Sequence, residues 1–325
     1  MAANESPKTL IEAVRYYSDL DRCQQKLVEA RWPNGVECPT CGRTDVVYLK
    51  NQRRWQCKSV HPKRQFSAKL GTIFEDSPIG LDKWFVTIWL IASAKNGISS
   101  YELQRSIGVK TQKTAWFMLH RIRLAMQAGG FEKKFQGHVE ADESFIGGRA
   151  RNMHASKRKR LGISQSKSMI GKIAVMGLLE RHGKESHSRV RLEVVQTRKK
   201  HQLEEVVTAN VEQGAALYTD ALRSYDRMAQ RGYVHHVIDH AEQYVDGQVH
   251  TNGLENFWSL LKRTLKGTYV SVEPFHLFRY LDEQVYRFNS RKMTDAARFD
   301  EMTKKLIGKR VTYAQLTGER LKQSA

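Results

Sequence analysis

Acidic residues at three separate points in the second half of the chain could together bind divalent metal ions. Asp142 and Asp220 lie in short apolar runs, and Glu255 follows Asp220 by 35 positions on a stretch with helical periodicity. Mg²⁺ prefers carboxylate oxygens, and two such ions roughly 4 Å apart can act on the attacking and the leaving oxygen of a phosphodiester displacement. These acids therefore predict metal-dependent phosphodiester chemistry, provided that the fold brings them together.

Other assignments of these acids stay open from the sequence alone. Five further acids compete with them: Glu140, Glu143, Asp226, Asp239 and Glu242. Asn252 and Glu255 also have the spacing of a capping box, in which Asn252 caps a helix and Glu255 bonds back to the cap. Two nearby histidines, His240 and His250, are expected to be structural or to contact phosphate in preference to acting as a general base.

Three cysteines and a histidine form a second candidate metal site. Cys38-Pro-Thr-Cys41 precedes Cys57-Lys-Ser-Val-His61. Two close pairs of such ligands suit tetrahedral Zn²⁺, which stabilises a segment too small to build its own core. The second pair has Cys-x-x-x-His spacing in place of the more usual Cys-x-x-Cys. The remaining cysteine, Cys23, lies on an apolar helical stretch and is expected to be buried.

Five predicted strands must position the first two acids. They are expected at 138–146, 172–180, 190–196, 216–220 and 233–239. Helices are expected at 200–211, briefly near 224–230, and from Asn252 onward. Consecutive strands followed by helix-linked strands favour an α/β fold with a mixed sheet covered by helices. In that order the fourth strand lies beside the first, which makes Asp142 and Asp220 neighbours.

The helix from Asn252 must position the third acid. At 100° per residue its large apolar side chains form one stripe: Leu254, Phe257, Trp258, Leu261 and Leu265. The opposite face carries the polar residues Asn252, Glu255, Ser259, Lys262 and Lys266. If the apolar stripe packs against the protein, one carboxylate, one amide and two ammonium groups point to the same place. This face suits a metal ion and the phosphates of a nucleic acid.

A helical region lies between the cysteines and the sheet. Helices are expected at 81–95, 99–107 and 111–127, and the turn 107–109 gives the last two the spacing of a helix-turn-helix. Gln112 and Lys113, at the start of the last helix, are candidates for contacts with base edges. The alternative is a plain helical bundle with a solvated basic face, to which three further residues would belong: His120, Arg121 and Arg123.

The charge of the chain favours a nucleic-acid partner. Lys and Arg number 54 against 34 Asp and Glu, which gives a net charge of +20. A basic run at 149–160, which we expect to be a loop between the first two strands, ends in Lys157, Arg158, Lys159 and Arg160. Such a run is usually solvated. Beside a phosphodiester site, however, each phosphate that it neutralised would steepen the salt dependence of binding, so we expect it to contact DNA.

A folded protein of the cytoplasm is expected, without a membrane partner. Hydrophobic residues make up 40% of the 325 residues, which suffices for a packed core. The longest apolar stretch, 84–94, is far shorter than the roughly 20 residues needed to span a bilayer. The first residues lack the pattern of a secretory signal. In a reducing compartment the cysteines should bind metal or remain thiols rather than form disulfides.

By composition, the chain divides into four segments. Residues 1–70 hold an amphipathic helical stretch, 9–31, and the cysteine cluster. Residues 71–130 are the helical module, and residues 137–290 contain the strands and the acids. Residues 291–325 form a basic, helix-prone tail to which the sequence assigns no role.

Four sequence runs resemble the zinc-ribbon group of bacterial insertion-sequence transposases. In chain order they are WQCKSVHPKRQFS (55–67), VEADESFIGG (139–148), LYTDALRSYD (217–226) and HTNGLENFWSLLKR (250–263). They occur in the order found in that family, and the last has the family's Asn three residues before the Glu. The resemblance extends over nearly the whole chain, to about residue 292.

The resemblance implies a ribonuclease H-like catalytic domain of the DDE type, preceded by a zinc ribbon and a helix-turn-helix-like module. Asp142, Asp220 and Glu255 would bind Mg²⁺ or Mn²⁺, with Asn252 beside them. The cysteine cluster, with His61, would hold structural Zn²⁺. The implied enzyme is a DNA transposase that cuts at the ends of its insertion sequence and joins the 3′-OH ends to target DNA.

The implied partner is double-stranded DNA, both the terminal inverted repeats of the element and the target. Pairing two DNA ends implies at least a homodimer, working in the bacterial cytoplasm on the nucleoid. Two other functions stay open. A non-enzymatic DNA-binding regulator would bind without metal-dependent nicking, and a metal-dependent nuclease would cut without strand transfer.

Overall fold

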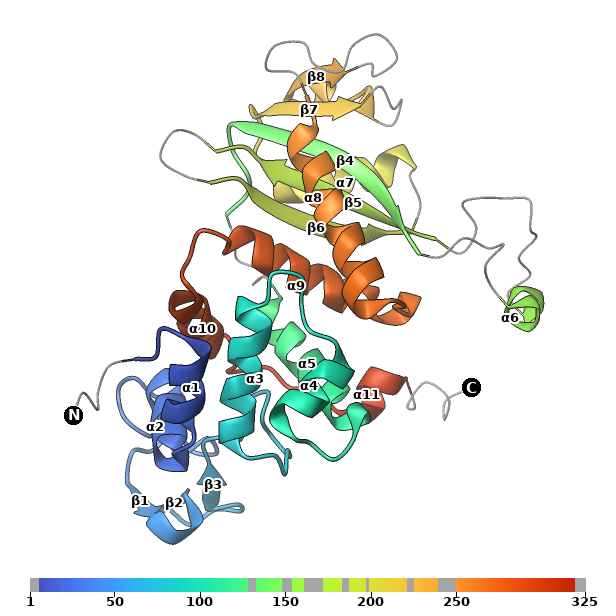
Figure 1. Ribbon diagram of the computed structural model, residues 1–325. Coiled ribbons are helices and arrows are strands. Elements are labelled where there is room, and N and C mark those ends of the chain that lie inside the picture. Colours follow the sequence, from blue (N-terminus) through green and yellow to red (C-terminus); the bar gives the residue numbers. More distant parts are fainter. Residues whose placement is uncertain are drawn as a thin grey trace. The chain divides into compact units, whose positions relative to one another are not determined.

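The computed structural model describes residues 6–127, 133–147, 154–160, 172–182, 187–196, 199–220, 225–238 and 250–318 (Figure 1). The chain forms two compact units, one of residues 1–127 with 293–325 and the other of residues 128–292. The segment after residue 292 thus folds with the N-terminal unit. Among the described helices, none is both long and apolar enough to cross a membrane.

The first unit begins with two short helices where the sequence pattern suggested one continuous stretch. Helix α1 spans Leu10–Tyr17 and α2 spans Leu20–Arg31. The break occurs because Asp19 caps a new helix, its side chain accepting from the backbone N–H of Asp21. Thr9 and Glu12 form a capping box at the start of α1. Cys23 is buried, as expected.

A small antiparallel sheet follows, built from β1 (Val46–Leu49), β2 (Arg54–Cys57) and β3 (Gln65–Ser67). A 3₁₀ turn, η1 (Lys50–Gln52), joins the first two strands. Trp55 of β2 packs between Tyr48 and Phe66 of the neighbouring strands, with ring centroids 4.9 and 6.1 Å away. These rings give the three short strands a small apolar core.

The rest of this unit is helical and confirms the expected pattern. It contains α3 (Leu81–Ser93), α4 (Ser100–Ile107), α5 (Gln112–Met126), α10 (Asp295–Lys304) and α11 (Tyr313–Thr317). Ser99 and Thr111 cap α4 and α5 through their side chains. Phe299 of α10 contacts Phe85 and Trp89 of α3, at 5.9 and 5.2 Å between ring centroids. The chain after residue 292 therefore completes the core of the first unit.

The alternative interpretation of α5, a solvated basic face, does not hold for the described residues of this helix's C-terminal half. His120, Arg121 and Arg123 are 0%, 5% and 1% exposed. Arg121 donates to the carbonyl oxygens of Ile73 and Glu75, at 2.9 and 2.8 Å. These three side chains are buried within the first unit, and Arg121 bonds to residues that lie 48 and 46 positions earlier in the chain.

The second unit contains a five-stranded mixed sheet, which confirms the expected fold class. Its strands are β4 (His138–Ile146), β5 (Ile173–Glu180), β6 (Arg189–Val195), β7 (Ala216–Asp220) and β8 (Val234–Ile238), in the order β6-β5-β4-β7-β8. The first three strands are antiparallel, whereas β7 pairs with β4 and β8 with β7 in parallel. The strand carrying Asp220 therefore lies beside the strand carrying Asp142.

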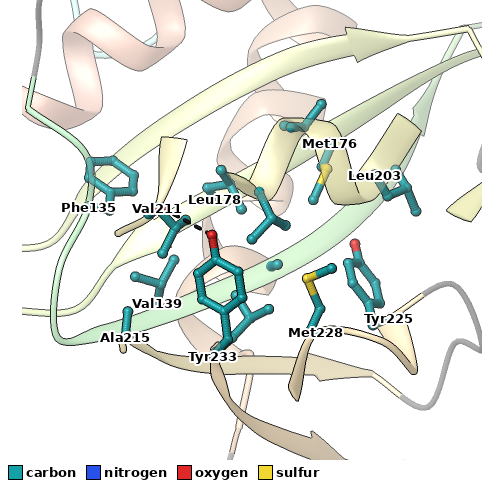
Figure 2. Packing of buried hydrophobic residues seen from close by; sticks show 14 of the residues in the cluster. Phe135, Val139, Met176, Leu178, Leu203, Val211, Ala215, Tyr225, Met228 and Tyr233 are labelled. Atoms are coloured by element: carbon teal, nitrogen blue, oxygen red, sulfur yellow. Dashed lines mark hydrogen bonds between the residues drawn. The ribbon is translucent and has the colours of Figure 1, made fainter. Parts of the chain in front are cut away.

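Different helices cover the two faces of this sheet (Figure 1). On one face α7 (Lys200–Asn210) packs against apolar side chains of the sheet, including Val139 and Ala141 of β4. Figure 2 shows this core, in which Tyr233 donates from its hydroxyl to the carbonyl oxygen of Val211 at 3.2 Å. On the other face lie α8 (Asn252–Thr264) and α9 (Leu277–Asn289).

The remaining elements of this unit are short. The helix expected near 224–230 is a single 3₁₀ turn, η4 (Ala229–Arg231), within the described residues. The basic run, expected to be a loop, contains a helix, α6 (Ala155–Arg160). After α8 the backbone continues as a π-helix, η5 (Leu265–Tyr269), and a 3₁₀ turn, η6 (Pro274–His276), precedes α9.

Candidate functional site

The three cysteines and His61 converge on one point, as their spacing predicted. Their ligand atoms all lie within 4.8 Å of one another. Cys38 Sγ lies 3.5 Å from His61 Nε2, and Cys41 Sγ lies 3.6 Å from Cys57 Sγ. This Cys₃His set and its spacing suit tetrahedral Zn²⁺.

Local contacts orient His61 and favour ionisation of Cys57, as metal binding requires. His61 Nδ1 lies 2.7 Å from the carbonyl oxygen of Pro62, so that its N–H can donate there and Nε2 can serve as the ligand. Burial opposes ionisation of the Cys57 thiol, but hydrogen bonds from His61 and the backbone of Ser59 outweigh it and lower its pKa to about 6. A thiol that ionises near neutral pH is suited to metal binding.

Asp142 and Asp220 lie on the second unit's two neighbouring parallel strands, just past the residues at which these strands pair. Glu140 of β4 is the register partner of Tyr218 of β7, and the two aspartates each follow two positions later. Because side chains alternate along a strand, the aspartates share the sheet face of Glu140 and Tyr218. Val139, Ala141 and Leu217 point to the opposite, α7-covered face.

Glu255 approaches this pair from α8. It lies in the first turn of the helix and is exposed, as is Asn252. The pKa of Asp142 is raised, chiefly by burial and further by the negative charges of Asp220 and Glu255. The negative charges of Asp220 and Glu255 therefore act on Asp142, and carboxylate oxygens are donors that suit a hard divalent cation. Among the described residues, however, only the Cys₃His set brings its ligand atoms close enough together to count as a group that could hold a metal ion.

Trp258 holds Asp142 in place, a contact that the sequence pattern did not predict. Its Nε1 donates to Asp142 Oδ2 at 2.9 Å, while the backbone N–H of Glu143 donates to Oδ1 at 2.8 Å. Trp258 was expected only to pack in the apolar stripe, and it is indeed 4% exposed. The available signal was chemical, because a buried indole N–H needs an acceptor.

Gly177 makes room for this tryptophan. It is the register partner of Asp142 on β5. A Cβ atom at this position would lie 2.7 Å from Cζ2 and 2.9 Å from Cη2 of Trp258. Only glycine therefore lets the indole lie against the sheet beside Asp142.

The capping-box interpretation of Asn252 and Glu255 is wrong. The N-cap of α8 is Thr251, which makes no side-chain capping hydrogen bond, and Asn252 is already helical. The backbone N–H of Leu254 instead donates to Glu140 Oε2 at 2.9 Å. A carboxylate from β4 thus caps the helix, which leaves the Glu255 side chain free of that role.

The competing acids have other surroundings. Glu140 is 1% exposed and accepts a hydrogen bond from the backbone of α8. Glu143 accepts a hydrogen bond from the hydroxyl of the buried Tyr225. Asp239 and Glu242 lie outside the described residues, as does His240. His250 lies beside Glu140, with Nδ1 3.6 Å from Oε1.

The candidate DNA-contacting residues lie in both units. Lys262 is exposed on the face of α8 that carries Glu255. Lys266 is also exposed, but it falls in the π-helix η5, which changes the residue spacing, so the α-helical face does not continue to it. In α6, Arg158 is half-buried and Lys159 is exposed, while the side chains of Lys157 and Arg160 lie outside the described ones.

In the first unit, the two candidates at the start of α5 make contacts within the protein. Gln112 Nε2 donates to Ser100 Oγ at 2.6 Å and links the starts of α4 and α5. Lys113 is exposed, and its Nζ lies 4.3 Å from the ring centroid of Tyr313 on α11. The segment after residue 292 therefore contacts the helix-turn-helix-like module directly.

A Cys₃His cluster ahead of a helical module, followed by a mixed sheet flanked by helices, fits the class of zinc-ribbon insertion-sequence transposases. Comparisons with known proteins agree. Residues 134–289 match the family model of the ISXO2-like transposase domain, and residues 19–59 match the transposase zinc-ribbon domain. The chain belongs to this transposase family.

Two curated relatives are similar to the chain. A protein in the transposable element ISH50 of Halobacterium salinarum is 27% identical over 75% of this chain and 82% of its own length. A transposase-like protein of Haemophilus influenzae is 30% identical over 27% of this chain and 71% of its own length. Both are described as uncharacterized. No solved structure matches the chain.

Proposed function

We propose that this protein is a DDE transposase that cuts DNA at the ends of its insertion sequence and joins the resulting 3′-OH ends to target DNA. The observation that carries the proposal is the convergence of Asp142, Asp220 and Glu255 from two adjacent strands and one helix. Family membership supports the same function. Two metal-dependent displacements would be needed. Water would first attack a phosphodiester at the element end, where the 3′ oxygen leaves as the 3′-OH, and this hydroxyl would then attack a phosphodiester of the target and displace a 3′ oxygen there.

The three carboxylates would hold Mg²⁺ or Mn²⁺. When bound, such ions would lower the pKa of the attacking hydroxyl and stabilise the charge that develops on the phosphate. Asp142 is oriented by Trp258 and by the backbone N–H of Glu143, so that its position is fixed before any ion binds. Asn252 and Lys262, exposed on the same helix as Glu255, would contact the phosphates of the DNA.

The remaining candidates would add contacts with DNA. Gln112 and Lys113 lie at the start of α5, and the α6 run, Lys157 to Arg160, adds positive charge. The Cys₃His cluster would hold structural Zn²⁺ and so keep the N-terminal ribbon folded. Because two element ends must be joined together, the active form would be at least a homodimer on DNA.

The test is nicking of supercoiled plasmid carrying the element ends, with Mg²⁺ or Mn²⁺ and with EDTA as control. Asp220→Asn should reduce nicking by at least about 10²-fold, the scale on which loss of one electrostatic stabiliser acts. DNA binding, measured by gel shift, should stay within about twofold of wild type, because Asp220 contributes no positive charge.

The assay also separates the alternatives. Nicking that requires metal and Asp220, followed by joining of labelled 3′-OH ends to target DNA, supports a transposase. Nicking without joining would favour a nuclease. Tight DNA binding with no nicking on paired element ends would favour a regulator and contradict the proposal.

A further inference from the structure

We propose that Arg181 and Glu140 form a buried positioning pair that fixes the three acid-bearing segments relative to one another before metal binds. This inference rests on the proposed function, because it concerns the same acid site. Neither residue is offered as a metal ligand. Their role is to hold the backbone that carries the ligands.

Arg181 follows the last residue of β5 and contacts all three segments that carry an acid. Its Nε donates to Glu140 Oε1 of β4 at 2.8 Å. Its guanidinium carbon lies 4.1 Å from the ring centroid of Tyr218 on β7. Its Nη2 donates to the carbonyl oxygen of His250, immediately before α8. One side chain thus joins β4, β7 and the start of α8.

The strand contacts have the same offset from the two aspartates. Glu140 precedes Asp142 by two positions, and Tyr218 precedes Asp220 by two. Glu140 and Tyr218 are register partners in the parallel pair. A two-residue step returns to the same face of a strand, so Glu140 and Tyr218 lie on the same face as the two aspartates. Arg181 therefore contacts the residues that are next to the acids on that face.

Glu140 extends this contact to the third acid. Its Oε2 accepts from the backbone N–H of Leu254, one residue before Glu255. The approach is close, because a Cβ at Gly253 would lie 2.9 Å from Oε2 and 3.0 Å from Oε1. The asparagine-glycine-leucine-glutamate sequence at 252–255 therefore contains both a candidate site residue and the glycine that admits the carboxylate.

Burial makes this pair different from the other ion pairs nearby. The side chains of Arg181 and Glu140 are 13% and 1% exposed, whereas Arg189, paired with Glu180 at 2.7 Å, is 48% exposed. A buried carboxylate without its partner is strongly disfavoured, while an exposed pair contributes little. The Arg181 contact should therefore constrain geometry, and the Arg189 contact should not.

The consequence is a preorganised acid site. Carboxylates that lie near one another repel until a cation binds between them. A pair that holds their backbones together opposes that repulsion and favours metal binding. Loss of contacts that orient metal ligands typically weakens metal affinity by about 10–100-fold.

The experiment measures Mn²⁺ binding to the full-length protein by the electron paramagnetic resonance signal of free Mn²⁺. The test variants are Arg181→Lys, which keeps the charge but loses the forked contacts, and Glu140→Gln, which keeps an acceptor for the Leu254 N–H but loses the charge. Arg189→Lys is the matched control. Asp142→Asn reports loss of the site itself, and thermal unfolding is recorded for every variant.

We expect Arg181→Lys and Glu140→Gln to raise the Mn²⁺ concentration for half-occupancy about tenfold. Arg189→Lys should stay within about twofold of wild type. In the plasmid assay the concentration of Mn²⁺ needed for half-maximal nicking should rise in parallel, while the rate at saturating Mn²⁺ stays near wild type. A purely structural role would lower stability without this separation of affinity from rate.

Two results would overturn the inference in distinguishable ways. If Asp142→Asn abolishes Mn²⁺ binding but both positioning variants bind Mn²⁺ as wild type does, the positioning role is wrong and the acid site stands. If wild type and Asp142→Asn bind Mn²⁺ equally, the acid site itself is wrong, and the positioning role fails with it.

Discussion

The cysteine cluster and the acid cluster are both candidate metal sites, but their residues are distributed along the chain in opposite ways. His61 follows Cys38 by only 23 positions, whereas Glu255 follows Asp142 by 113. A metal ion can close a short loop by itself, while distant segments must be brought together by a folded core. The first site should therefore depend on its metal for folding, and the second should be assembled by its sheet and helices.

Breaking the cysteine cluster should have the largest effect on stability. Cys41→Ser removes one of four ligands, and structural Zn²⁺ contributes on the order of 10 kcal/mol to the folding of such a segment. We expect loss of bound zinc and rapid proteolysis within residues 38–67. The second unit should stay protease-resistant, because it forms a compact unit of its own.

Zinc content per chain and limited proteolysis measure this outcome. Cys23→Ala is the control, because Cys23 is buried outside the cluster. A Cys41→Ser protein that retains zinc and an intact ribbon would contradict the metal dependence.

Gly177→Ala tests whether packing assembles the acid site. The new Cβ would lie 2.7 Å from Trp258, and overpacking of this kind costs about 1–3 kcal/mol. The expected result is a lower free energy of unfolding of the second unit, measured with urea, together with weaker Mn²⁺ binding. Gly267→Ala should change neither, because nothing lies within 4 Å of a Cβ at that position.

Trp258→Phe tests whether one hydrogen bond within the folded core contributes to the acid site. An aromatic ring remains, although a smaller one, but the 2.9 Å bond to the Asp142 carboxylate is lost, which removes about 1.5–3 kcal/mol. We expect a modest loss of stability and about tenfold weaker Mn²⁺ binding. Trp89→Phe, at a buried tryptophan of the first unit, controls for the smaller ring and should leave Mn²⁺ binding unchanged.

Lys262→Ala should have the smallest effect, because its side chain is exposed. If Lys262 contacts one phosphate, the slope of log K against log salt should fall by about 1, with stability unchanged. Fluorescence anisotropy on labelled DNA measures this slope at several salt concentrations. Lys305→Ala, whose ammonium pairs with Glu301 at 2.6 Å, should leave the slope as it is in wild type.

Much of the fold was predictable because local patterns agree with tertiary packing. The expected strand at 138–146 has those bounds in the structure, and the alternation of side chains places Val139 and Ala141 in the core. Capping residues such as Ser99 marked a helix start correctly. The sequence could not decide whether α5 has a solvated basic face, because the burial of Arg121 depends on segments distant in sequence.

For the candidate site, the sequence offered a set of residues but no geometry. The types of the acids left several candidates open, and the family resemblance pointed to Asp142, Asp220 and Glu255. Nothing in the local sequence distinguished Glu140 from a metal ligand, or Asn252 from a helix cap. Those distinctions depend on which backbone N–H a carboxylate meets, and the Leu254 N–H is 114 positions from Glu140.

The sequence by itself determined most of the strand and helix order and the four residues of the cysteine cluster, because side-chain chemistry and periodicity are local properties. Only the tertiary structure decided that Glu140 caps α8, that Trp258 and Gly177 hold Asp142, and that Arg181 joins the three acid-bearing segments. Those roles arise from contacts between residues far apart in the chain, whose burial determines which charges must be paired.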